Sequence, residues 1–172
     1  MGYVNDTHMH EWIPPTLFHC VTGTWSDAAG AVGNTIVYKK SAANETSILT
    51  IPVELPMNDG QEKGAYLVSV DLYWSLLTGA YTTITAAINK WILPANGAAI
   101  GTIEALAFSY DTGHDTAGER NTMDEHVMTL TLTTPVWIEE DHVIQVQLTN
   151  VAGVGGGVFD FIGMRANYTY RL

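Results

Sequence analysis

Residues 65–76 have the sequence AYLVSVDLYWSL, in which apolar and mixed positions alternate without a break. A period of two held over this stretch predicts a β-strand with one buried face and one wetter face. The predicted buried set is Tyr66, Val68, Val70, Leu72, Trp74 and Leu76. A second apolar run, Tyr81–Leu93, follows after the tight segment Leu77–Ala80. We therefore expect the two runs to form the central hairpin of the domain.

Further strands are predicted on both sides of this hairpin, and Gly, Pro and Asn-rich turn signals separate them. Pro52 cannot donate a hydrogen bond to a ladder, which favours an edge strand or a bulge at that position. No amphipathic helical segment is present. About nine strands without helices predict an all-β fold, an antiparallel β-sandwich that is most simply a jelly roll. The remaining predicted strands are 16–25, 35–39, 47–55, 102–110, 127–133, 142–150 and 158–171.

The length of 172 residues predicts one β-sandwich domain, residues 16–172, preceded by an extended N-terminal arm, residues 1–15. Pro14 and Pro15 exclude a helix at the end of the arm. His8 and His10 would lie on one side of an extended chain, but two imidazoles do not make a metal site. The apolar anchor Trp12 could order the arm against a neighbouring subunit.

The charge of the chain argues against two classes of partner. Eighteen acidic against seven basic residues give a formal net charge of −11, which repels nucleic acid and anionic membranes. No apolar run reaches membrane-spanning length. Residues 1–6 have neither the basic region nor the apolar core of a signal peptide, so we expect synthesis in the cytoplasm.

The sequence offers four places where chemistry could occur, and each has a simpler structural interpretation. Cys20 is adjacent to His19, but neighbouring strand residues face opposite sides, so a small buried hydrophobe is expected. The acidic loop Asp111–His126 could bind Ca²⁺ or a transition metal, yet its spacing matches no EF-hand and a solvated loop with Arg120 pairing locally is expected. Glu139–Asp141 is interpreted as a solvated turn, and Gly153–Gly157 as a mobile hairpin tip. We therefore predict no catalytic residue, no cofactor and no metal site.

The aromatic residues leave two readings open. Sugar faces stack on exposed rings, so the five tryptophans and eight tyrosines allow a carbohydrate-binding module. Aromatic residues are also enriched in subunit interfaces. Trp74 is expected in the core and Tyr73 on the wetter face of its strand, whereas Trp25, Trp91 and Trp137 fall near strand ends.

Taken whole, the chain resembles the small β-sandwich virion proteins encoded in tailed-phage and environmental viral genomes. The stretches that carry the resemblance are Gly64–Trp74, Phe108–Asp115, Leu130–Ile138 and Arg165–Leu172. The resemblance implies a non-enzymatic structural protein of a virion, such as a capsid decoration protein. Its implied partners are further copies of the chain, in a homo-oligomer, and another virion protein such as a capsid protein.

Two functions from different classes follow. The first is the virion component that acts through subunit contacts, and the alternative is a carbohydrate- or receptor-binding β-sandwich. If the protein assembles, the second face of the strand that begins the predicted hairpin is one of the first places where we expect a neighbouring subunit. That face carries Leu67, Ser69, Asp71 and Tyr73, a mixture unlike an ordinary solvent-facing strand.

Overall fold

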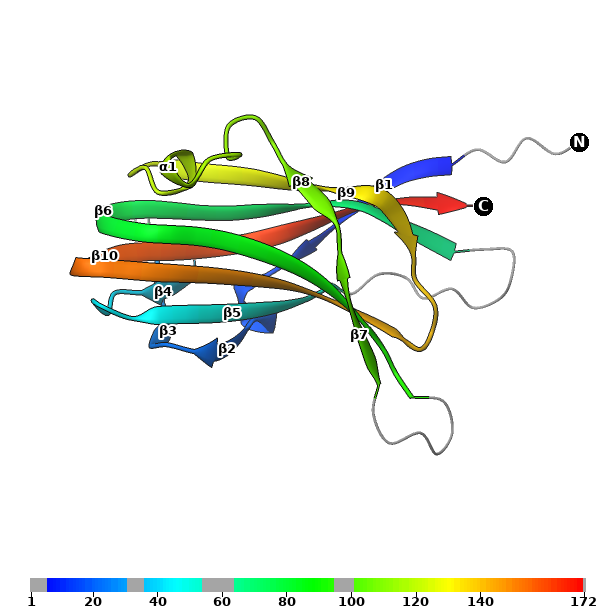
Figure 1. The fold of residues 1–172 in the computed structure, drawn as a ribbon, viewed down its shortest axis with the longest axis horizontal. Helices are drawn as coiled ribbons and strands as arrows, with labels where there is room; N and C mark the ends of the chain where they lie inside the picture. Colours follow the sequence, from blue (N-terminus) through cyan, green and yellow to red (C-terminus); the bar gives the residue numbers. More distant parts are fainter. Residues whose placement is uncertain (1–5, 31–35, 54–63, 95–100, 172) are drawn as a thin grey trace, which may run out of the picture.

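A computed structural model describes residues 6–30, 36–53, 64–94 and 101–171. The strand pairings in these ranges are antiparallel, and the single α-helix there has four residues. The prediction of an all-β antiparallel sandwich is therefore confirmed (Figure 1). No helix in the described ranges is long and apolar enough to cross a membrane. The elements are β1 (Asp6–Ile13), η1 (Pro15–Leu17), β2 (His19–Thr22), β3 (Trp25–Ala29), β4 (Ile36–Lys40), β5 (Thr46–Val53), β6 (Gly64–Ile92), β7 (Thr102–Leu106), β8 (Phe108–Tyr110), α1 (Ala117–Arg120), β9 (Glu125–Trp137) and β10 (His142–Arg171).

The fold is organised by one long ribbon, made of β6 and β10. These two strands pair from His142 opposite Ile92 to Arg171 opposite Gly64. Figure 1 shows both strands turning back at one end of the molecule. The predicted hairpin is therefore wrong in its pairing: the chain does turn near Gly79, but each half of β6 pairs with β10 and not with the other half.

Two glycines form the corner of this ribbon. Gly79 has φ +87° and Gly156 has φ +65°, backbone conformations that residues with a Cβ rarely adopt. A Cβ on Gly79 would lie 1.9 Å from the carbonyl oxygen of Gly156, so the two backbones touch. Gly153–Gly157 is thus part of a bulge in β10 where the register slips between Ala152 and Gly157. The prediction that these glycines form a hairpin tip is wrong.

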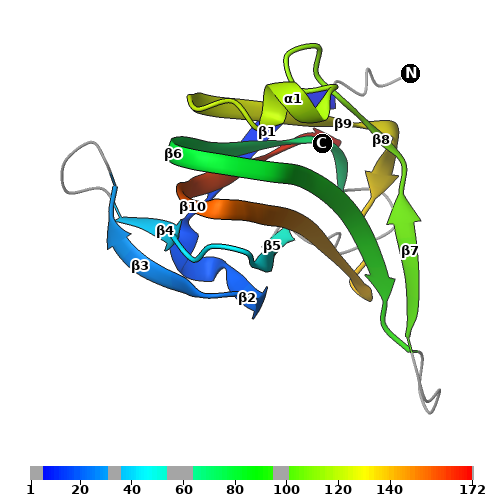
Figure 2. The same cartoon turned by 60° about the vertical axis from the view of Figure 1, so that its left-hand side comes forward.

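The folded ribbon gives the sandwich its two layers (Figure 2). In the first layer, residues 64–78 of β6 and 157–171 of β10 are flanked by β9 on one side and by β1 and β4 on the other. In the second layer, residues 81–92 of β6 and 142–152 of β10 are flanked by β7 and by β5, with β2 beyond it. An antiparallel pair that folds from one layer into the other is compatible with the predicted jelly roll.

The core lies between the layers and is rich in stacked rings. Trp74 is fully buried, as predicted, and stacks on Phe159 at 6.2 Å and on His126 at 4.9 Å. The alternations predicted for β5 and the start of β10 are confirmed, because Leu49, Ile51 and Val53 and also Ile144, Val146 and Leu148 are buried. The pairing of β5 with β2 ends at Thr50. Pro52 therefore lies on a stretch of β5 that does not pair with β2, and its missing N–H is not needed for a hydrogen bond to that strand.

A β-bulge at Val68 changes which residues of β6 face the core. The register slips on both sides of β6: by one residue on β10, between Asn167 and Tyr168, and by three residues opposite β9, where Leu67 pairs with Val136 but Ser69 pairs with Thr131. Leu67 is consequently buried, whereas Tyr66 and Val68 are only half-buried. The predicted inward face is correct from Val70 to Leu76 and wrong at Tyr66 and Val68.

In the N-terminal segment predicted as an arm, Asp6–Ile13 are extended and pair with β10 as β1. The predicted strand 16–25 is divided by η1 and by a turn at Gly23, where φ is +92°. Part of the predicted loop after it is a strand, β3. The turn signals expected between predicted strands within residues 54–63 and 95–100 lie outside the described residues.

Candidate functional site

The best candidate is the solvent side of the first layer, which we call the outer face. Opposed residues in antiparallel strands share a face, so the register sets rows of side chains across β1, β10, β6 and β9. The rows are His8–Thr169–Tyr66–Trp137, His10–Asn167–Ser69–Thr131, Trp12–Arg165–Asp71–Thr129 and Gly163–Tyr73–Val127. The second face predicted from the sequence, with Ser69, Asp71 and Tyr73, is therefore the centre of this surface.

Trp12 is the most prominent ring on the outer face, with 46% of its surface exposed. Its benzo ring rests on Gly163: a Cβ there would lie 2.2 Å from Cζ2 and 2.5 Å from Cη2. The Tyr73 ring meets the indole edge-on, with the ring centroids 5.2 Å apart. Any side chain at position 163 would displace Trp12, so the glycine fixes where this exposed ring lies.

A buried carboxylate organises the polar groups beside Trp12. Asp71 is 3% exposed, and its Oδ2 accepts hydrogen bonds from Arg165 Nε at 2.9 Å, Arg165 Nη2 at 2.7 Å and Asn167 Nδ2 at 2.9 Å. Its Oδ1 accepts from Thr129 Oγ1 at 2.7 Å. Hydrogen bonding to Asp71 raises the pKa of Arg165, which keeps the guanidinium charged. The pair is neutral as a whole, and it holds Arg165 and Asn167 in fixed positions.

A second pair of rings lies at the other end of the outer face. Tyr66, turned outward by the bulge, packs against Trp137 with the ring centroids 4.8 Å apart. Between the two aromatic pairs is a hollow of about 270 Å³, to which His8, His10, Ser69 and Asn167 contribute polar groups. The outer face is thus aromatic at both ends and polar in the middle.

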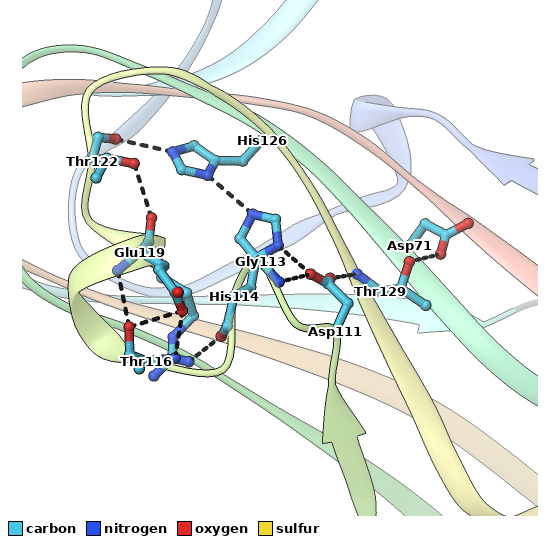
Figure 3. Close-up of polar contacts among 10 residues, drawn as sticks. Asp71, Asp111, Gly113, His114, Thr116, Glu119, Thr122, His126 and Thr129 are labelled. Atoms are coloured by element: carbon cyan, nitrogen blue, oxygen red, sulfur yellow. Dashed lines mark hydrogen bonds and ion pairs between the residues drawn. The ribbon is translucent and has the colours of Figure 1, made fainter.

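The acidic loop is tied down by a chain of histidines (Figure 3). His126 Nε2 lies 2.9 Å from the Thr122 carbonyl oxygen, His126 Nδ1 lies 3.1 Å from His114 Nε2, and His114 Nδ1 lies 2.8 Å from Asp111 Oδ1. Both end partners only accept, so His126 Nε2 and His114 Nδ1 are the donating nitrogens of these two bonds. All four ring nitrogens are engaged, so a metal ion would have to displace these bonds.

Other contacts dock the loop onto the sandwich. Burial alone disfavours the charged Asp111, but hydrogen bonds from His114, the Thr129 N–H and the Gly113 N–H outweigh it and lower its pKa. Arg120 is 6% exposed and donates to the carbonyl oxygens of Ile84 and His114. Most loop residues are exposed and Arg120 pairs with His114 within the loop, both as predicted, but Arg120 is itself buried and also reaches Ile84 on β6.

Thr129 connects the loop to the outer face. Its backbone N–H donates to Asp111 Oδ2 at 2.7 Å, and its hydroxyl donates to Asp71. Figure 3 shows this link on β9. A continuous hydrogen-bonded path therefore runs from the histidine chain to Arg165 and Asn167.

The acidic turn after β9 brings Glu139, Asp141 and His142 together, with one ligand atom of each within 4.8 Å of the others. His142 Nδ1 accepts a hydrogen bond from the Glu139 N–H at 3.2 Å, which leaves the ring hydrogen on Nε2. Nε2 is the atom that faces the two carboxylates, at 3.8 Å and 3.6 Å. A nitrogen that carries hydrogen cannot ligate a metal, so in this arrangement the neutral ring directs its N–H toward the two carboxylates.

Cys20 lies on β2 and is exposed, which contradicts the predicted buried hydrophobe. The surrounding protein atoms, and then the charge of Glu45, raise the pKa of its thiol. Its Sγ donates to the carbonyl oxygens of Thr22 and Gly23. A thiol with a raised pKa carries less of the reactive thiolate.

Sequence reasoning missed Gly163, Arg165 and Asn167. A glycine inside an alternating strand often marks a close approach by another group, and Gly163 carries this signal. Arg165 and Asn167 carried none, because their importance depends on the pairing of β10 with β6.

Comparisons with known proteins give no family. No family model matches the sequence, and no curated protein matches it. Among solved structures, 95% of the chain aligns with the Agl-KA catalytic domain (TM-score 0.43, 9% identity) and 93% with the enzymatically active domain of bacteriophage CBA120 tailspike protein 4 (0.36, 7%). The chain spans only 28% and 19% of those two chains. It also aligns over 94% of its length, and 99% of the other chain, with the family 32 carbohydrate-binding module of C. perfringens NanJ in complex with galactose (0.37, 15%). Similarities at these TM-scores do not indicate a function. The evidence for function is therefore the geometry of the outer face.

Proposed function

We propose that this protein is a non-enzymatic carbohydrate-binding β-sandwich that recognises its ligand with the outer face. The observation that carries the proposal is Trp12, an exposed ring held in place by Gly163 and Tyr73 beside a fixed polar cluster. The apolar face of a sugar stacks on such a ring. Arg165 and Asn167, oriented by Asp71, supply the few placed polar groups that give a ligand site its specificity.

The arrangement supports binding rather than bond cleavage. Both oxygens of Asp71 already accept hydrogen bonds, and the carboxylate is buried beneath Arg165. A general acid or base has to reach the proton that it transfers. Asp71 instead orients its neighbours, which is the role of a positioning residue.

The test is the variant Trp12→Ala, titrated with a panel of soluble neutral polysaccharides (hydroxyethylcellulose, galactomannan and dextran) by affinity electrophoresis. Loss of a central aromatic anchor is expected to weaken binding roughly tenfold or more. Trp91→Ala is the matched control, because Trp91 is 41% exposed but belongs to the second layer. Circular dichroism establishes that both variants fold. If Trp12→Ala binds a polysaccharide of the panel as tightly as the parent, or if the parent binds none, the proposal fails.

A second candidate is the virion structural protein suggested by the sequence resemblance, acting through contacts between copies and with a capsid protein. It is favoured by the apolar edge of the outer face, where Val127 is 51% exposed next to Tyr73. Sedimentation velocity separates the candidates. An assembled parent that Trp12→Ala dissociates would support a subunit interface on this face in place of a glycan.

A further inference from the structure

The outer face is longer than one sugar needs. The pairs Trp12–Tyr73 and Tyr66–Trp137 lie at its two ends. Tyr73 and Tyr66 are seven residues apart on β6, which corresponds to roughly 20 Å at about 3.3 Å per strand residue. The hollow that contains Ser69 and Asn167 lies between them. A ligand that used both aromatic pairs would have to be an extended chain.

The charge of the face points to an uncharged ligand. The guanidinium of Arg165 is neutralised by Asp71 at 2.7 Å. The chain as a whole carries a net charge of −11, which repels an acidic polymer. Hydroxyl groups are the ligand groups that Ser69, Asn167, His8 and His10 can meet without any charge to compensate.

We propose that the outer face binds an internal stretch of a linear, neutral polysaccharide. The polymer lies along the strands, with one sugar on Trp12 and Tyr73, another on Tyr66 and Trp137, and the intervening sugars over the polar hollow. This inference rests on the proposed function, because it assigns the ligand class and direction of that same surface.

Such a ligand gains affinity with its length. A short oligosaccharide covers one aromatic pair and loses nothing if the other pair is removed. A longer one engages both pairs, and the second contact is effectively intramolecular once the first is made. The dependence on Trp137 therefore appears only above the length that spans the face.

The experiment is calorimetry with di- to octasaccharides prepared from the panel polysaccharide that binds the parent protein. The octasaccharide is expected to bind roughly tenfold or more tightly than the disaccharide. Trp137→Ala is expected to remove this gain, so that its affinities for the disaccharide and the octasaccharide become similar. Tyr66→Ala, on the neighbouring strand, gives an independent measurement should Trp137→Ala fail to fold, and Trp91→Ala is again the control.

The outcomes separate this inference from the function on which it rests. If affinity is flat with length and both Trp137→Ala and Tyr66→Ala bind like the parent, while Trp12→Ala still loses binding, the extended site is wrong and carbohydrate binding stands. If Trp12→Ala has no effect, both fail. Equal affinity for polygalacturonate, an acidic polymer, would overturn the neutral ligand class.

Discussion

At the scale of single residues, the outer face depends on the absence of a side chain as much as on the side chains present. Gly163 leaves the space that the benzo ring of Trp12 fills. Its φ is not positive, so the backbone there would accept another residue. What fixes glycine at this position is therefore the ring above it, not the conformation of the chain.

Gly163→Ala is predicted to weaken ligand binding while the protein still folds. The new methyl group would lie 2.2 Å from Trp12 Cζ2, so the indole has to leave its place. Near-UV circular dichroism should change, and glycan affinity should fall about as much as in Trp12→Ala. Gly155→Ala is the matched control on the same strand, because no atom lies within 4 Å of a Cβ at Gly155. Unchanged binding by Gly163→Ala would show that the ring position is not what the ligand recognises.

The sequence identified part of this surface at the residue scale. Ser69, Asp71 and Tyr73 were assigned to one mixed face because strand alternation is local, and the structure places them together. Trp12 was recognised as an anchor, but its partner was not. Its position follows from the pairing of β1 with β10, and the two strands are about as far apart in the chain as possible. Alternation carries no information on which strands pair.

At the scale of elements, the same limit explains both errors in β6. A turn after an alternating run predicts a hairpin, yet here the turn is a corner at which two paired strands bend together. The bulge at Val68 left no signal either, because Tyr66, Leu67 and Val68 are all apolar and fit either face. The predicted inward set failed only on the N-terminal side of the bulge, where the register with β10 had slipped by one residue.

The loop between β8 and β9 gives a prediction at this scale, Asp111→Asn. Asp111 caps the Gly113 and Thr129 N–H groups and accepts from His114, and these bonds lower its pKa. An acidic group whose pKa is lower in the folded state stabilises that state at any pH above its unfolded-state pKa of about 3.9. This stabilisation is lost as the pH falls toward the folded-state pKa. Asp111→Asn should therefore lower the free energy of unfolding by about 1 kcal/mol at pH 7, a value kept small because the side chain is partly exposed.

Urea denaturation of parent and variant at several pH values measures this difference. The gap between them should be constant from pH 7 to about 5 and shrink below about pH 4, where the parent loses its carboxylate. Glu125→Gln, an exposed change near the same loop, should leave the unfolding free energy unchanged at every pH. A gap that persists in acid would mean that Asp111 acts through packing and not through its charge.

At the scale of the whole molecule, one connected hydrogen-bonded path joins the loop between β8 and β9 to the polar groups of the outer face. The path runs from the histidine chain through Asp111, Thr129 and Asp71 to Arg165. Some acidic groups outside this path lie on exposed turns, such as the turn at Glu139 and Asp141, whereas Asp160 is buried on β10 beside Lys39. Exposed acidity favours solubility, and the groups on the path are already bonded within the protein.

The last prediction follows for metal ions. One millimolar Ca²⁺ or Zn²⁺ should leave the melting temperature of the protein unchanged, because the ring nitrogens of His114 and His126 are engaged and Nε2 of His142 carries a hydrogen. A site with a Kd one-hundredth of the ion concentration would stabilise the fold by about 2.7 kcal/mol, which for a chain of this size is a rise of roughly 5–10 °C. Differential scanning fluorimetry resolves such a rise easily, and EDTA serves as the reference condition. A rise with Zn²⁺ that His114→Gln removes would place a metal site in the loop, whereas one that His142→Gln removes would place it at the acidic turn.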